Sequence, residues 1–117
     1  MTLKMKGIDH PALAVSDVDS MADWCRDVLG YHALTGRPGG VWLMQAPDGS
    51  YLEIMSQNDD ERQERENLTP GFSHLALRVE NLEQAIDELD MRQVKWTSDI
   101  IDAVGGGRLR NFADPDG

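Results

Sequence analysis

Three side chains that could bind a divalent metal stand at related positions in the sequence. His10 opens the stretch His-Pro-Ala-Leu-Ala-Val, and His74 opens His-Leu-Ala-Leu-Arg-Val, which agrees with it at four of six positions. Glu53 lies four residues beyond a Pro-Asp-Gly turn. Two imidazoles and one carboxylate suit Zn, Ni, Co, Mn or Fe in the divalent state. We therefore predict that His10, Glu53 and His74 bind one divalent metal ion.

The same residues fall on defined faces of predicted strands. Alternate side chains of a strand share a face, so His10 lies with Ala12, and His74 lies with Arg78. The small Ala12 leaves room in front of the His10 ring. Arg78 has two possible roles, because it could pair with Glu53 or hold an anionic group of a substrate.

The hydrophobic pattern predicts one unit of secondary structure written twice. Apolar residues at helical spacing after Asp17, and again after Asn81, predict two amphipathic helices, and Gly30 is expected to end the first. Alternating apolar residues predict strands on both sides of each helix. The predicted strands are residues 7–15, 31–34, 41–45, 51–55, 72–79, 94–97 and 108–112. We therefore predict an α+β fold built from two tandem βαβββ modules.

The two copies of this unit differ in length. We assign module one to residues 1–57, an acidic linker to residues 58–70, and module two to residues 71–117. A strand that carries Glu53 follows the first Pro-Asp-Gly turn, whereas the second such turn ends at Gly117. The repeat thus predicts a missing last strand with a fourth ligand near position 121, and we interpret residue 117 as the end of the sequence in hand rather than of the working protein. The alternative is a site with three protein ligands and an open position.

The composition narrows the class of partner. The formal net charge of −10 and a sequence pI near 4.5 argue against nucleic acid and anionic membranes, which are bound through Lys and Arg. A single cysteine, Cys25, cannot close an internal disulfide, and no apolar run approaches the roughly 18 residues of a membrane span. We expect a cytoplasmic protein.

The remaining candidates have simpler interpretations. Trp42 and Met55 are expected to line a substrate cavity, since the concave face of a sheet must be lined by side chains. Cys25 lies on the apolar stripe of the first helix, where burial keeps a thiol unreactive. A turn is favoured over a phosphate-binding loop for Gly105–Gly107, because no helix signal follows these glycines.

Five motifs follow one another along the whole chain: Ile8-Asp-His10, Gly30-Tyr31, Leu52-Glu53-Ile54, Gly71-Phe-Ser-His74-Leu-Ala and Asn111-Phe-Ala-Asp-Pro-Asp-Gly117. Through these motifs the chain resembles the vicinal oxygen chelate superfamily, which includes glyoxalases, bleomycin resistance proteins and extradiol dioxygenases. The resemblance implies paired βαβββ modules that form a curved mixed sheet around a central metal and ligand cavity. It also implies that His10, Glu53 and His74 are three of the four metal ligands, in an order similar to that of metal-dependent glyoxalase I.

The resemblance implies a metal-dependent lyase or isomerase of the glyoxalase I (lactoylglutathione lyase) type. In such enzymes a metal stabilises an enediolate or enolate while a carboxylate transfers a proton, and Glu53 would be both ligand and base. Two alternatives stay open: an enzyme similar to methylmalonyl-CoA epimerase, and a metal-free protein of the bleomycin resistance type that binds a small molecule. In each case we expect a small-molecule ligand and a homodimer.

Overall fold

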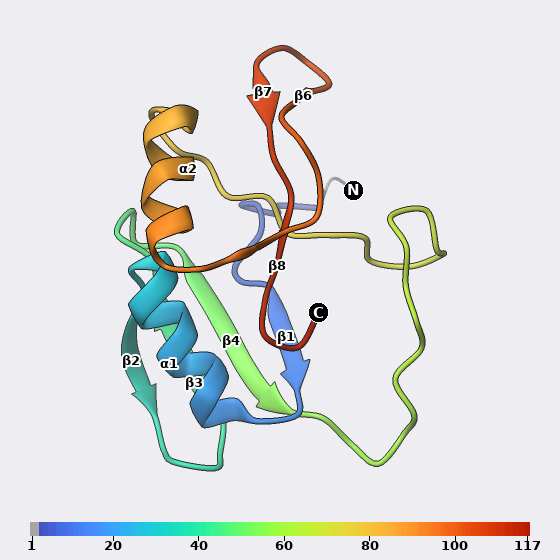
Figure 1. Ribbon diagram of the computed structural model, residues 1–117. Coiled ribbons are helices and arrows are strands. Elements are labelled where there is room, and N and C mark those ends of the chain that lie inside the picture. Colours follow the sequence, from blue (N-terminus) through green and yellow to red (C-terminus); the bar gives the residue numbers. More distant parts are fainter. Residues whose placement is uncertain (1–2) are drawn as a thin grey trace. The chain divides into compact units, whose positions relative to one another are not determined.

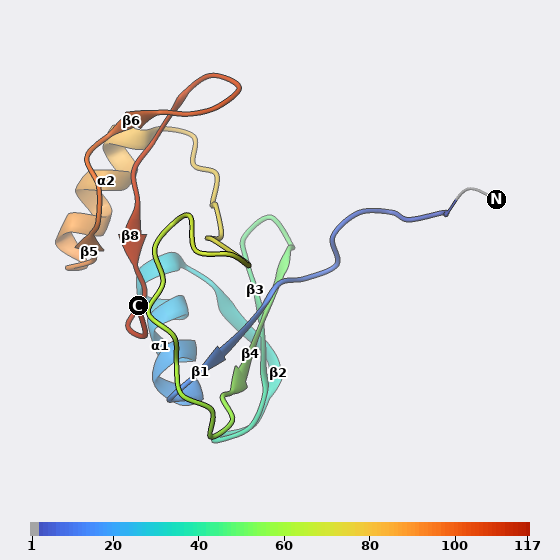
Figure 2. The same ribbon diagram turned by 90° about the vertical axis from the view of Figure 1, so that its right-hand side faces the viewer.

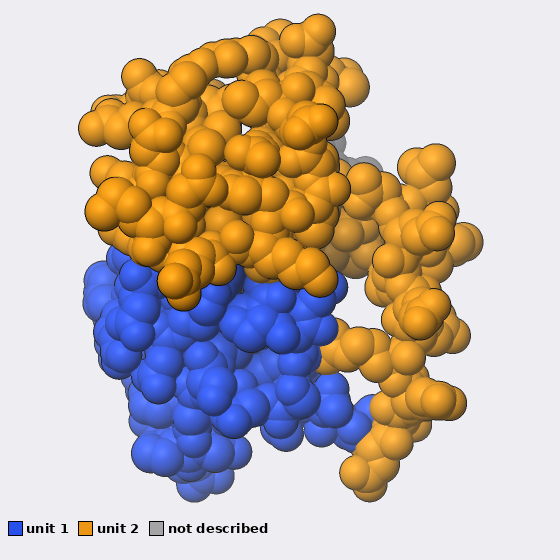
Figure 3. Space-filling model, viewed as in Figure 1, with its two compact units in different colours: residues 1–58, 114–117 blue, residues 59–113 orange. Residues whose placement is uncertain are grey.

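The computed structural model describes residues 3–117. Its elements follow the order β1, α1, β2, β3, β4, α2, β5, β6, β7 and β8 along the chain (Figures 1 and 2). Helices and strands both build the structure, so the predicted α+β class is confirmed. The chain divides into two compact units (Figure 3): residues 1–58 with 114–117 form unit 1, and residues 59–113 form unit 2. Each unit is described by itself.

Unit 1 contains a four-stranded mixed sheet. Its strands lie in the order β1-β4-β3-β2, with β1 parallel to β4 and the other neighbours antiparallel. A parallel pair needs a long connection, which here includes α1. The first module therefore has the predicted βαβββ order. The strands are β1 (Ala12–Val15), β2 (His32–Gly36), β3 (Trp42–Gln45) and β4 (Tyr51–Ser56).

Helix α1 (Val18–Leu29) begins and ends where the sequence predicts. The Asp17 carboxylate accepts a hydrogen bond from the Ser20 backbone N–H at 3.0 Å, which satisfies a donor that the first turn leaves free. Gly30 ends the helix in the left-handed conformation, with a φ of 77° that glycine adopts without strain. Figure 2 shows α1 lying along one face of the sheet.

The core of unit 1 lies between α1 and that face of the sheet. Met44 of β3 and both Leu52 and Ile54 of β4 are almost completely buried there, and Met21 and Cys25 meet them from the helix. Alternate residues of β4 thus face the core. A shift of β4 by one residue would expose both apolar side chains, so their burial fixes its register and turns the residue between them to the opposite face.

Unit 2 has one helix and two short strand pairs. Asn81 caps α2 (Leu82–Met91), because its side chain accepts from the Gln84 N–H at 2.9 Å, as the sequence predicts. Strand β5 (Lys95–Trp96) pairs with β8 (Phe112–Ala113), and β6 (Ile101–Asp102) pairs with β7 (Arg108–Leu109). Among residues 3–117, neither helix has the length and apolar character to cross a membrane.

Several predicted strands differ from those observed. Residues 72–79 form no strand, since no described residue pairs with them in a sheet, and their side chains are exposed. The strand predicted for residues 7–15 is regular only in β1. The predicted strand 108–112 is divided into β7 and β8, because the glycine turn at residues 105–107 joins β6 to β7 as a hairpin. Alternation marks a segment that is able to form a strand, but the strand forms only beside a hydrogen-bonding partner.

Candidate functional site

Two of the three predicted metal ligands meet in unit 1. In the parallel register of β1 and β4, Ala12 lies beside Glu53, and the Glu53 N–H donates to the Pro11 carbonyl at 3.0 Å. This backbone contact brings the residue before Pro11 to the Glu53 side chain. His10 Nε2 lies 2.9 Å from Glu53 Oε2, and the two side chains keep 34% and 25% of their exposure. The sequence therefore brings an imidazole and a carboxylate together on the face opposite the core.

Asp9 holds the other nitrogen of the same imidazole. Its Oδ2 lies 2.7 Å from His10 Nδ1, and because a carboxylate only accepts, Nδ1–H is the donor. This hydrogen bond raises the pKa of His10 above its ordinary value, and the negative charge of Glu53 also raises it. His10 therefore lies between two carboxylates: its Nδ1–H donates to Asp9, and its Nε2 faces Glu53.

The donor atoms of this pair suit a divalent cation. With the metal about 2.0–2.2 Å from each donor, two ligands of one ion lie close to 3 Å apart, as His10 Nε2 and Glu53 Oε2 do. A carboxylate on Nδ1 is the usual means of orienting a histidine whose Nε2 binds a metal. Within residues 3–117, no group of three His, Cys, Asp or Glu side chains is arranged to hold a metal. The observed arrangement is thus a pair of donors.

The other predicted site residues of module two belong to unit 2. His74 lies on the extended segment 72–79, where its Nδ1 is 2.9 Å from the Ser73 hydroxyl oxygen. Arg78 lies on the same segment and is exposed. The roles predicted for His74 as a ligand and for Arg78 as a substrate contact remain predictions.

Trp42 and Met55 lie on opposite faces of the unit 1 sheet. Trp42 pairs with Ile54 across β3 and β4, so it shares the core face, whereas Met55 alternates with Ile54 and shares the face of Glu53. The Trp42 indole N–H donates to the Asp19 carboxylate of α1 at 2.9 Å. The structure therefore separates two residues that we predicted to line one cavity, because the register of β3 against β4 is not apparent from sequence.

Two groups of residues escaped the sequence prediction. Asp9 precedes His10 directly, and adjacent residues of a strand point to opposite faces, so its contact with the imidazole was not expected. It forms because β1 begins only at Ala12. The second group is the acids Asp19 and Asp23, which lie with Trp42 around a hollow of about 320 Å³ between α1 and the strands β2 and β3. Trp42 was expected to line a cavity, but the two acids gave no signal in the sequence.

Comparison with known proteins places the chain in a family. The model of the Glyoxalase/Bleomycin resistance protein/Dioxygenase superfamily matches residues 7–117. The chain belongs to this superfamily. The sequence is similar to that of the uncharacterized protein YwkD of Bacillus subtilis, a curated relative. The two are 29% identical over 117 aligned residues, and the match covers 96% of this chain and 91% of the relative.

Solved structures of the glyoxalase superfamily share the fold. Lactoylglutathione lyase from Agrobacterium tumefaciens aligns with a TM-score of 0.71 and 16% identity, over 98% of this chain and 90% of that protein. A mutant of the fosfomycin resistance protein FosX from Listeria monocytogenes, solved with Mn(II) and 1S,2S-dihydroxypropylphosphonic acid, aligns with a TM-score of 0.73 and 19% identity, over 96% and 84%. Proteins of this fold thus include a lyase and a resistance protein that binds Mn(II), and at these identities the likeness concerns the fold.

Proposed function

We propose that this glyoxalase superfamily chain is a metal-dependent lyase or isomerase of the glyoxalase I type, acting on a small α-oxygenated substrate. The observation that carries the proposal is the 2.9 Å approach of His10 Nε2 to Glu53 Oε2 on the sheet face opposite the core. Glu53 keeps a quarter of its side-chain exposure there, although both of its neighbours in β4 are buried. An acid held between two core residues and aimed at an imidazole suits a ligand better than a surface charge.

The residues of the chain have separate tasks in this proposal. His10 and Glu53 would hold the divalent ion, with His74 as the third protein ligand. When bound, the ion would supply Lewis-acid polarisation of a substrate oxygen. Glu53 would take a proton from the carbon beside that oxygen and return it to the neighbouring carbon. Asp9 keeps the Nδ1 proton of His10 in place, so that Nε2 faces Glu53.

The test is metal analysis followed by a thiol-dependent methylglyoxal assay. We expect about one divalent ion per chain and turnover that depends on it. Glu53→Gln, which keeps the size of the side chain, should lose most of the turnover. Glu61→Gln makes the same change on the exposed segment after β4 and should retain it. Stoichiometric metal that survives in Glu53→Gln together with unchanged turnover would refute the role of Glu53.

The same experiment separates this proposal from its alternatives. Activity on an acyl-CoA instead of the thiol adduct of methylglyoxal would place the chain with the epimerases. A purified chain that takes up no Zn, Ni, Co, Mn or Fe and yet binds a small molecule would place it with the binding proteins of the bleomycin resistance type. Either result would overturn the glyoxalase assignment.

A further inference from the structure

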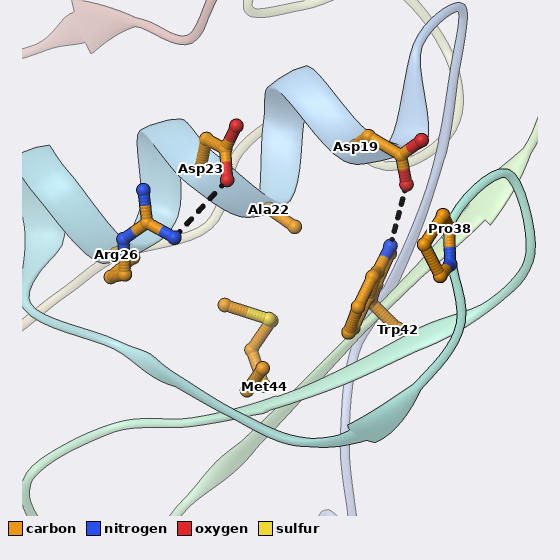
Figure 4. Close-up of a pocket in the computed structure, with 8 residues that line it drawn as sticks. Asp19, Ala22, Asp23, Arg26, Pro38, Trp42 and Met44 are labelled. Carbon is orange, nitrogen blue, oxygen red and sulfur yellow. Dashed lines mark hydrogen bonds and ion pairs between the residues drawn. The ribbon is translucent and has the colours of Figure 1, made fainter.

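A hollow on the helix side of the unit 1 sheet has no part in the proposed reaction. Its volume is about 320 Å³, which lies at the lower end of the range of small-molecule pockets. It opens between α1 and the strands β2 and β3, on the face opposite Glu53. Its lining is Asp19, Ala22, Asp23, Arg26, Ala33, Pro38, Trp42 and Met44, all within unit 1 (Figure 4).

The floor and walls of this helix-side hollow are apolar. Met44 is 1% exposed and forms the floor, while the small side chains of Ala22 and Ala33 leave space that larger residues would fill. Figure 4 shows the Trp42 indole nearly edge-on, with Met44 on one side and Pro38 on the other. Because the ring is edge-on to the viewer, one of its faces points towards Met44 and the hollow, where its π-electrons can contact a bound molecule.

The Trp42 ring is fixed before any ligand arrives. Its Nε1–H donates to Asp19 Oδ1 at 2.9 Å, and the same carboxylate accepts from the Gly39 backbone N–H at 2.9 and 3.0 Å. On β2, a Cβ at Gly36 would lie 2.6 Å from the Trp42 ring, so only glycine lets the indole lie this close to the β2 backbone. An aromatic wall held from two sides loses little freedom on binding, which favours affinity.

Charge at the rim favours a cation. Asp19 and Asp23 contribute two carboxylates, and Asp27 follows Asp23 one turn further along α1. Among the residues that line the hollow, the one basic side chain, Arg26, is already paired: its guanidinium lies 3.2 Å from Asp23 and 2.9 Å from Asp27. Asp19 accepts from two donors, the Gly39 backbone N–H and the Trp42 indole N–H, and both are neutral, so neither offsets its charge. The rim therefore carries an excess of negative charge beside an aromatic wall.

From these features we propose that the helix-side hollow binds a small organic cation, of the quaternary ammonium class, against the face of Trp42. The apolar floor takes the methyl groups, the indole contacts the cationic head, and Asp19 and Asp23 supply the field that distinguishes a cation from a neutral molecule. An anion is disfavoured because the guanidinium that could receive it is occupied by two carboxylates. This binding site is independent of the proposed metal chemistry on the other face.

Choline and its neutral isostere 3,3-dimethylbutan-1-ol are suitable probes, because they differ in charge but hardly in shape. We expect choline to bind one per chain, to shift the NMR signal of the Trp42 indole N–H, and to bind about tenfold more tightly than the alcohol. The signal is identified by its loss in Trp42→Phe. Equal binding of the alcohol would refute cation recognition, and no binding of choline would refute the site.

Two pairs of variants locate the binding. Ala33→Ile fills the hollow from an exposed position of β2 and suits a strand, whereas His32→Ile places the same side chain on the opposite face. Choline binding should be lost in the first and kept in the second. Asp23→Asn should weaken binding severalfold, while Asp59→Asn, an equal charge change in unit 2, should not. Binding that persists in Ala33→Ile, with circular dichroism showing a folded chain, would overturn the proposal.

Discussion

Replacement of Asp9 by Asn tests how the candidate metal site is oriented. The Asp9 carboxylate accepts from His10 Nδ1 at 2.7 Å, a distance typical of a charge-assisted hydrogen bond. Asn can accept in the same place, but without charge. Loss of such an orienting contact usually lowers metal affinity about 10–100-fold. Because the Asp9 side chain is 87% exposed and water competes for it, we expect a loss of metal affinity at the lower end of this range, about tenfold.

Two measurements follow this change. Competition with a chromophoric chelator gives the affinity for Zn²⁺ and Co²⁺ at fixed pH, with Asp59→Asn as the matched charge control and Asp9→Glu as the variant that restores a carboxylate. Nitrogen-15 NMR of the His10 ring reports, without metal, whether the proton stays on Nδ1. A wild-type chain that binds no metal would refute the proposed function alone. Unchanged affinity together with unchanged ring shifts in Asp9→Asn would refute the orienting role of Asp9.

Three further predictions concern the scaffold that presents the site. Gly30→Ala should lower the free energy of unfolding by about 1 kcal/mol in urea titrations, because φ is 77° there and no neighbouring atom hinders the new Cβ. Burial raises the pKa of the Cys25 thiol to about 11, so at pH 8 only about one thiol in a thousand is ionised and its reaction with Ellman's reagent should be at least about a hundredfold slower in the folded chain than in urea. The Ser20 N–H lowers the pKa of Asp17 below its ordinary 3.8, so the stability that this cap contributes is complete above pH 3.8 and fades as the pH falls towards the lowered value. The difference in urea midpoint between wild type and Asp17→Ala should shrink accordingly, and a constant difference would contradict the assignment.

Local signals in the sequence predicted unit 1 well. The bounds of α1 were predictable because a capping acid, an apolar stripe and a terminal glycine all lie within the helix or next to it. The faces of β4 were predictable because the apolar residues Leu52 and Ile54 alternate with Glu53 in the sequence, and burial follows the same alternation. The meeting of His10 with Glu53 followed from these faces and from the parallel pairing that a βαβββ order implies.

Features that depend on a distant partner were not predictable. Residues 72–79 alternate as regularly as β1 and still form no strand, since pairing depends on another segment and not on the pattern itself. Trp42 and Met55 were predicted to line one cavity but lie on opposite faces of the sheet, because the register between β3 and β4 is set by the turn and by core packing. The contact of Asp9 arises where regular strand geometry ends, and there the alternation rule does not apply.

The two proposed sites lie on opposite faces of one sheet, and this separation has a measurable consequence. Burial of Leu52 and Ile54 turns Glu53 to the metal-site face, and the same alternation places Trp42 on the helix side. The two groups of side chains share no hydrogen-bonding partner in the described chain, so changes in them should be additive. Ala33→Ile should therefore leave metal affinity within about twofold of wild type, and Asp9→Asn should leave choline affinity within the same limit. A double variant whose losses depart from the sum of the single losses would show that the sheet couples its two faces, and the two sites would then have to be treated as one.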